Sequence, residues 1–166
     1  STLSSSSAAS DVYKRQAIDY LMSQGKKVGM IAVHLYRPFS VKHLLAAVPK
    51  SVKRIAVLDR TKEPGAEGEP LYLDVKSAFY DVENKPLIVG GRYGLGSSDT
   101  TPAKIIAVYD NLELPEPKNH FTVGIVDDVT FTSLPEVEEI PLGGESTYEA
   151  KFYGLGAVSY THLTLP

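Results

Sequence analysis

The sequence predicts an α/β fold, a three-layer domain with a mostly parallel sheet and helices on both faces. Three observations predict this class. Short continuous apolar runs alternate along the chain with segments whose apolar residues recur at helical spacing. Polar loops rich in glycine and proline separate the two kinds of segment. Strands that alternate with helices in this way form parallel sheets through right-handed crossovers.

The clearest unit of this pattern lies in residues 53–82. Residues 55–58 are apolar and end at Asp59 and Arg60, which predicts a strand buried on both faces. A charged loop with proline and glycine follows. Apolar residues then return at helical spacing, at Leu71, Val75, Ala78, Phe79 and Val82. In open α/β sheets, ligands and partners meet the loops that follow strands, so this loop is a candidate contact region.

The first part of the domain shows the same alternation. A helix ends at Gly25, and the apolar run 28–33 predicts a central strand that continues to a sheet edge over 35–39. Ser40 is suited to cap a helix that ends at Pro49.

The second part continues the alternation. Residues 86–89 predict a strand that runs into a glycine-rich loop, 90–96. Thr101 and Pro102 fit the N-cap and first position of the next helix. Residues 121–126 predict a further strand.

Both ends differ from the middle of the chain. Residues 1–16 are rich in serine, have no periodicity and lack the apolar segment of a signal peptide, so we expect a non-native or disordered tail. We expect the α/β domain over 17–128, a linker over 129–147 and the truncated start of another domain over 148–157. Residues 158–166 are expected to be a second non-native tail.

Composition excludes several classes of function. Of the 166 residues, 43% are apolar, which suffices for a core, and the net charge of −3 gives no reason to expect nucleic acid or an anionic membrane as partner. No apolar run is long enough to span a bilayer. The chain has no cysteine, which excludes disulfides, thiolate zinc sites and cysteine-held iron–sulfur clusters within it and agrees with a cytoplasmic protein.

The glycine-rich loop is the first candidate site, with Gly91, Arg92, Tyr93 and Gly94 as its central residues. Such a loop brings backbone N–H groups and a helix N-terminus close to a phosphate or carboxylate, with Arg92 as a second contact. However, the glycine spacing is not that of a dinucleotide or P-loop motif. A tight turn packed against a neighbouring domain explains the glycines as well, and we favour it.

The loop after the strand 55–58 is the second candidate, with Arg60, Thr61, Lys62 and Glu63. The positive charges of Arg60 and Lys62 could bind an anion. Alternatively Glu63 pairs with one of them, and an exposed pair contributes only about 0–1 kcal/mol. We favour this explanation or a domain interface. No nucleophile–base arrangement and no histidine spacing for a metal is present, so we expect neither a catalytic residue nor a bound metal.

Several motifs resemble those of the pyruvate:ferredoxin (flavodoxin) oxidoreductases, and they occur in that family's order. The matching segments are HLYRPFS (34–40), IAVLDRTKEPG (55–65), GEPLYLDV (68–75), GGRYGL (90–95), NHFTVGI (119–125) and DDVT (127–130). The resemblance covers residues 17–157 and is similar to the family's second domain, which has a transketolase C-terminal-domain-like fold. Residues 152–156, FYGLG, resemble the opening of the next domain.

The resemblance implies a parent enzyme that oxidatively decarboxylates pyruvate to acetyl-coenzyme A. Family members use thiamine diphosphate, Mg and iron–sulfur clusters, are expected to be homodimers, and pass electrons to ferredoxin or flavodoxin. The cofactors are held by other domains. This segment is therefore expected to be a packing domain that binds no cofactor and is inactive alone, with Arg60, Lys62, Arg92 and Tyr93 as interdomain or interface contacts.

The alternative is a free-standing α/β module that binds a phosphate or an organic anion. The two hypotheses differ in the surface that they predict. An excised packing domain exposes an apolar patch, whereas a free-standing module is monomeric and soluble.

Overall fold

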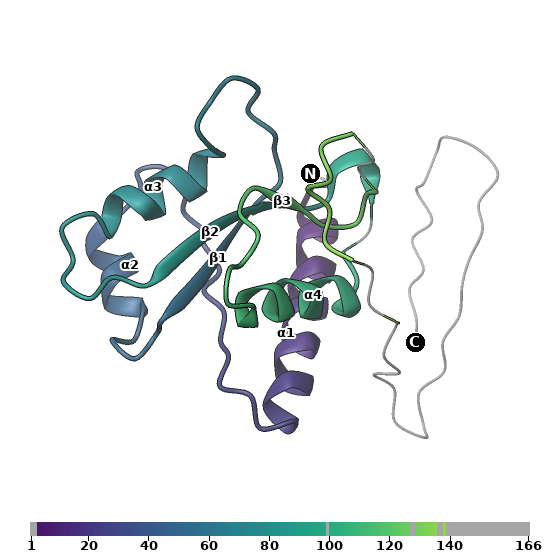
Figure 1. Ribbon diagram of the computed structural model, residues 1–166, viewed down its shortest axis with the longest axis horizontal. Helices are drawn as coiled ribbons and strands as arrows, with labels where there is room; N and C mark the ends of the chain where they lie inside the picture. Colours follow the sequence, from purple (N-terminus) through teal and green to yellow (C-terminus); the bar gives the residue numbers. More distant parts are fainter. Residues whose placement is uncertain (1–2, 99, 127–128, 136–137, 139–166) are drawn as a thin grey trace.

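The computed structural model describes residues 3–98, 100–126, 129–135 and 138. Along the chain its elements are α1 (Leu3–Ser23), α2 (Val41–Ala47), β1 (Arg54–Asp59), α3 (Pro70–Ala78), β2 (Leu87–Arg92), a 3₁₀ turn η1 (Leu95–Ser97), α4 (Pro102–Glu113) and β3 (Phe121–Thr122). The strands form a parallel sheet in the order β1-β2-β3. Helices α2 and α3 lie on one side of the sheet and α1 and α4 on the other (Figure 1). The predicted three-layer α/β fold is confirmed.

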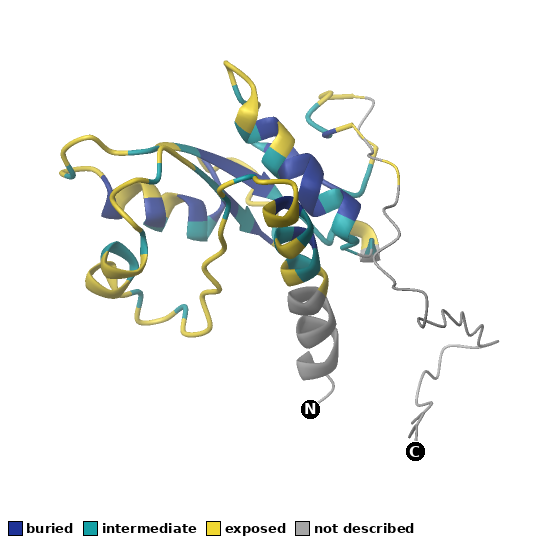
Figure 2. Cartoon of the chain, turned by 90° about the horizontal axis from the view of Figure 1, so that it is seen from below, coloured by how far each residue is buried: buried dark blue, intermediate teal, exposed yellow. Residues whose placement is uncertain are grey.

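The core divides into two apolar layers because side chains alternate between the faces of a strand. Toward α3, Val57 of β1 packs with Tyr72 and Val75. Toward α4, Val89 of β2 packs with Val108 and the fully buried Phe121. Figure 2 shows this burial along the strands and on the inner faces of α3 and α4. The sheet is thus covered on both faces, as its continuous apolar strands predict.

The helix starts follow the sequence signals. Ser40 is the N-cap of α2, and its side chain accepts a hydrogen bond from the backbone N–H of His43. Pro70 and Pro102 stand in the first turns of α3 and α4, where a missing N–H costs nothing. Thr101 is the N-cap of α4, as predicted, although its hydroxyl makes no capping bond.

Helix α1 begins at Leu3, so it runs through most of the segment that we expected to be a tail. Its second half packs on α4, where Ala17 and Leu21 meet Ile105 and Ile106. The non-native origin of residues 1–16 stays a prediction.

The first residues of the expected linker pack against β3. Leu134 is buried, and its N–H donates to the Thr122 carbonyl at 2.9 Å. The rest of the linker, the expected start of another domain and the C-terminal tail lie outside the described residues, apart from residue 138.

The predicted central strand over 28–33 is wrong. This segment belongs to no helix or strand, and much of its apolar surface is exposed: Ile31 is 45% accessible and the following Leu35 72%. An apolar run indicates that a segment favours burial, but it does not indicate which surface covers it. In the described part of the chain, no strand pairs with residues 28–33.

The lengths of the last two strands also differ from expectation. β2 continues through Gly90, Gly91 and Arg92, which we assigned to a loop, and β3 holds only two residues instead of the predicted 121–126. Glycine is uncommon inside strands, which is why the pattern suggested a loop. β2 is an exception because aromatic rings pack directly against its glycines.

Candidate functional site

The three strands end side by side and place their last side chains together. In the register of the sheet, Asp59 of β1 pairs with Arg92 of β2, and Arg92 pairs with Thr122 of β3. Neighbours in register point to the same face of a sheet. The side chains of Asp59, Arg92 and Thr122 therefore all lie on the α3 face at the carboxyl edge, where α/β proteins bind ligands.

Asp59, the last residue of β1, caps the start of α3. Its Oδ1 accepts a hydrogen bond from the N–H of Leu71 at 3.0 Å, and its Oδ2 accepts one from Tyr72 at 3.1 Å. Both are N–H groups that an α-helix cannot satisfy internally. Burial raises the pKa of Asp59, the two amide bonds oppose this, and the charges of Glu69 and Asp74 add to the rise.

Arg92 forms an ion pair with Glu69, the residue just before α3. The distance from Nε of Arg92 to Oε1 of Glu69 is 2.5 Å, and the two side chains are 14% and 3% exposed. A buried charge such as that of Glu69, or a half-buried one such as that of Arg92, is stable only when it is paired. Oε2 of Glu69 has no hydrogen-bond partner in the described part of the chain. The pair fixes the guanidinium of Arg92 at the edge of the sheet.

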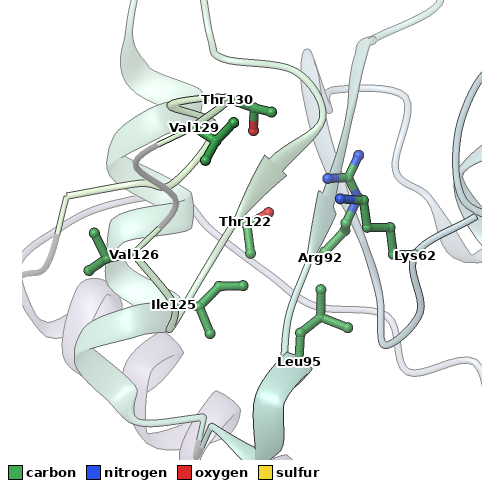
Figure 3. Close-up of a pocket in the computed structure, with 8 residues that line it drawn as sticks. All are labelled: Lys62, Arg92, Leu95, Thr122, Ile125, Val126, Val129 and Thr130. Atoms are coloured by element: carbon green, nitrogen blue, oxygen red, sulfur yellow. The ribbon is translucent and has the colours of Figure 1, made fainter. Parts of the chain in front are cut away.

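A cavity of about 370 Å³ opens beside Arg92. It is lined by Lys62, Arg92, Leu95, Thr122, Ile125, Val126, Val129 and Thr130. Figure 3 shows the nitrogen atoms of Lys62 and Arg92 on one side of this cavity, with Val126 and Val129 on the other and Thr122 between them. The cavity is therefore cationic on one side and apolar on the other.

The loop after β1 contributes only one of its four candidate residues to this cavity. Lys62 lines it, whereas Arg60 lies against Gly94, where its Nε would be 2.9 Å from an added Cβ. Glu63 forms no ion pair with a described residue and accepts a long, 3.5 Å hydrogen bond from the Thr61 hydroxyl. The expected pairing of Glu63 with a cation of its own loop is not seen.

Packing explains the glycines of β2. A Cβ on Gly90 would lie 2.9 Å from the Tyr72 ring, and one on Gly91 would lie 2.2 Å from the Phe121 ring. Gly94 has a positive φ of 65°, as a left-handed turn requires. The side chain of Tyr93 faces α1, and the Lys14 ammonium lies 4.9 Å from its ring centroid. These glycines serve ring contacts and a turn.

Sequence reasoning missed seven residues of this site, which are Glu69 and six that line the cavity: Leu95, Thr122, Ile125, Val126, Val129 and Thr130. An acidic residue directly before the Pro70 of a helix was the available signal for Glu69. The other six carry no signal of their own, because they join the cavity only through the register of β2 and β3 and the turns that follow these strands.

The described residues form no cluster of metal ligands, and the sequence offers no thiolate for an iron–sulfur cluster. The sequence has no cysteine, and no three histidine or acidic side chains converge anywhere in the described ranges. The acidic pair Asp127-Asp128 lies outside these ranges. No described helix is both long enough and apolar enough to span a bilayer.

Comparison with known proteins decides the family. The profile of a family described as pyruvate:ferredoxin oxidoreductase core domain II matches residues 4–105, more than half of the chain. The chain belongs to this family. The resemblance seen in the sequence motifs is thus confirmed, and the parallel sheet with helices on both faces is consistent with this core domain II.

Curated relatives support the assignment over a longer range. A pyruvate-flavodoxin oxidoreductase of Enterobacter agglomerans is 57% identical over 144 residues, and a pyruvate:ferredoxin oxidoreductase of Moorella thermoacetica is 54% identical over 142 residues. Both matches cover 86% of this chain but only 12% of the relative. A pyruvate-flavodoxin oxidoreductase of a Nostoc species is 58% identical over 120 residues, which are 72% of this chain and 30% of that protein. The chain thus spans a small part of larger proteins.

Proposed function

We propose that this chain is a domain of an enzyme that oxidatively decarboxylates pyruvate to acetyl-coenzyme A and passes the electrons to ferredoxin or flavodoxin. The match of residues 4–105 to core domain II of this family carries the proposal. Other domains of the parent hold thiamine diphosphate, Mg and the iron–sulfur clusters. The parent acts in the cytoplasm as a homodimer, and this domain contributes packing surfaces and no catalytic residue.

The exposed apolar segment 30–35 supports a packing role. Met30, Ile31, Val33 and Leu35 are 36–72% exposed, and Figure 2 shows the surrounding connection from α1 to α2 as largely exposed. Four exposed apolar side chains within six residues are typical of a contact with another protein surface. In the Enterobacter agglomerans relative, the 144 matched residues make up only 12% of the chain, so ample chain remains to cover this surface.

Polar contacts hold the end of this segment in place. The Tyr36 hydroxyl donates to Asp74 of α3 at 3.0 Å, and Nη1 of Arg37 donates to the same Oδ2 at 2.7 Å. The guanidinium of Arg37 also stacks on the Tyr36 ring, 3.9 Å from its centroid. The apolar segment is therefore anchored to the domain at its carboxyl end, as a preformed contact surface requires.

A domain exchange tests the proposal. Residues 17–135 replace the matching segment of the Enterobacter agglomerans enzyme, and pyruvate-dependent reduction of flavodoxin is measured. We expect activity within about threefold of the parent, because the segments are 57% identical. The 166-residue chain alone, with added thiamine diphosphate, is expected to be inactive. Turnover by the isolated chain, or an exchanged enzyme that folds but has no activity, contradicts the proposal.

The contact surface is tested with Ile31→Lys in the exchanged enzyme. We expect loss of assembled, active enzyme, while the thermal midpoint of the isolated chain stays unchanged because Ile31 is 45% exposed there. Tyr80→Lys is the matched control, since Tyr80 is 75% exposed and lies just beyond the C-terminal end of α3. Equal effects of both substitutions in the exchanged enzyme would contradict a contact at residues 30–35.

A further inference from the structure

We propose that the cavity beside Arg92 binds a small organic anion, a carboxylate or phosphate group carried on a short apolar body. This site goes beyond the packing role, because nothing in the proposed reaction requires it. The cavity lies at the carboxyl edge of a parallel sheet, the usual position of ligands in α/β folds. Its two sides differ in chemistry, and each side argues for one part of the ligand.

Arg92 supplies a fixed fork of donors. Glu69 holds its Nε, and the side chain is only 14% exposed, so the guanidinium has little freedom. Its two terminal nitrogens donate to no described residue. Half-buried donors without acceptors are costly, and a carboxylate or phosphate satisfies both at once in the bidentate geometry that arginine favours.

Among the described residues that line the cavity, Lys62 adds a positive charge that no ion pair compensates. Glu69 compensates the charge of Arg92, but Lys62 forms no ion pair or hydrogen bond with a described residue. Its ammonium group and the guanidinium face the same cavity (Figure 3). An anion bound between them is attracted by both cations and offsets their mutual repulsion.

Thr122 adds a neutral donor beside the cations. The residue is only 3% exposed, yet it lines the cavity, and no described residue hydrogen-bonds to its hydroxyl. Its register opposite Arg92 on the neighbouring strand places both side chains on the same face of the sheet. One anionic group is therefore reached from three successive strand ends or the loops that follow them.

The opposite side of the cavity requires an apolar body on the ligand. Ile125, Val126 and Val129 form this side, whereas Leu95 lies below Arg92 (Figure 3), and Val126 and Val129 are 80% and 81% exposed. A volume of about 370 Å³ lies at the small end of the range typical of ligand pockets, about 300–1,000 Å³. Inorganic phosphate alone leaves the apolar side uncovered, whereas an organic anion buries it.

Titration of the full 166-residue chain with n-butyl phosphate, inorganic phosphate and n-butanol tests the site by ¹H–¹⁵N NMR. We expect saturable shifts at Arg92, Tyr93 and Thr122 with n-butyl phosphate. Binding of inorganic phosphate should be at least about tenfold weaker, because even partial burial of its four CH₂ or CH₃ groups favours the organic ligand. n-Butanol should not bind. Equal affinity for both phosphates, or no saturable shift, would overturn the proposal.

Two substitutions separate the polar and apolar contributions. Lys62→Gln should weaken n-butyl phosphate binding about tenfold, since a charge-assisted bond is lost. Lys53→Gln, which removes the same charge from an exposed residue just before β1, at the opposite end of that strand, should leave binding unchanged. Ile125→Thr should weaken n-butyl phosphate binding but not that of inorganic phosphate. Equal effects of the two lysine substitutions would show non-specific attraction and refute the site.

The exchanged enzyme distinguishes a free ligand from an acidic side chain of another domain. If the occupant is a small molecule, n-butyl phosphate binds the exchanged enzyme with an affinity similar to that of the isolated chain. Loss of this binding in an active exchanged enzyme would overturn the small-molecule assignment, because it would mean that another domain fills the cavity.

Discussion

The ring of Phe121 occupies the position that a side chain on Gly91 would need. A Cβ built on Gly91 lies 2.2 Å from Cε2 of Phe121, and Phe121 is fully buried between β3 and α4. This contact lets β2 and β3 pair directly before they reach the cavity. The glycine is therefore a packing requirement of the sheet on which the candidate site stands.

Gly91→Ala should destabilise the domain by about 2–3 kcal/mol, because the added methyl group overpacks a closed core. Denaturant unfolding measures the loss. Gly29→Ala is the control, since no heavy atom lies within 4 Å of its added Cβ and its φ is not positive. We expect less than about 0.5 kcal/mol there. A change at Gly91 as small as the control would contradict the close packing.

Glu69→Ala should cost about 3 kcal/mol, because it leaves the Arg92 charge half-buried without its partner. Adding Arg92→Ala to this variant should restore part of the stability, which a double-mutant cycle detects. The comparison pair is Lys26 and Asp110, 3.3 Å apart and largely exposed, whose coupling should be below about 1 kcal/mol. Similar coupling in the two pairs would contradict the role of burial.

Asp59 should make the domain less stable as pH rises out of the acid range. Burial raises its pKa above the ordinary 3.8, so the folded state holds the proton more tightly than the unfolded chain. The resulting stability is fully present below about pH 3.8 and is lost as pH rises through the folded pKa. At each pH, the unfolding free energy of Asp59→Asn is subtracted from that of the unsubstituted chain. The difference isolates the pH dependence that Asp59 contributes. If the Asp59 contribution to stability rises with pH instead, burial is not the main influence on the pKa of Asp59.

Asp74→Asn should loosen the segment 34–40, because Tyr36 and Arg37 both donate to the Asp74 carboxylate. Hydrogen exchange measured by mass spectrometry should be about threefold faster or more over this segment, and unchanged in β1 and β2. Asp81→Asn, at an exposed aspartate just beyond α3, is the control. Unchanged exchange in 34–40 would mean that other contacts hold the segment.

The spacing of apolar residues was enough to predict the elements that pack one face against the rest of this chain. Helix α3 was predicted from Leu71, Val75 and Ala78, and the last two are buried as expected. The same reasoning failed at 28–33, because an apolar run does not say which surface will cover it. It also missed the continuation of β2 through Gly90 and Gly91, because the rings that require those glycines come from distant residues.

The candidate site could be predicted only in part. Lys62 and Arg92 were expected contacts because cations follow strand ends, and both line the cavity. Thr122 and Glu69 could not be selected, because each meets Arg92 only through the strand register or the position of α3. Arg60 was an equal candidate to Lys62 by sequence, and the turn at Gly94 takes it elsewhere.

The sequence by itself determined the α/β class, the family motifs and the absence of thiolate ligands, because these depend on local periodicity and residue type. Only the tertiary structure decided which cation is buried, which glycines serve ring contacts and which side chains share a cavity. The physical reason is that parallel strands are joined by long crossovers. Residues that touch at the sheet edge, such as Asp59, Arg92 and Thr122, are about thirty positions apart in the chain.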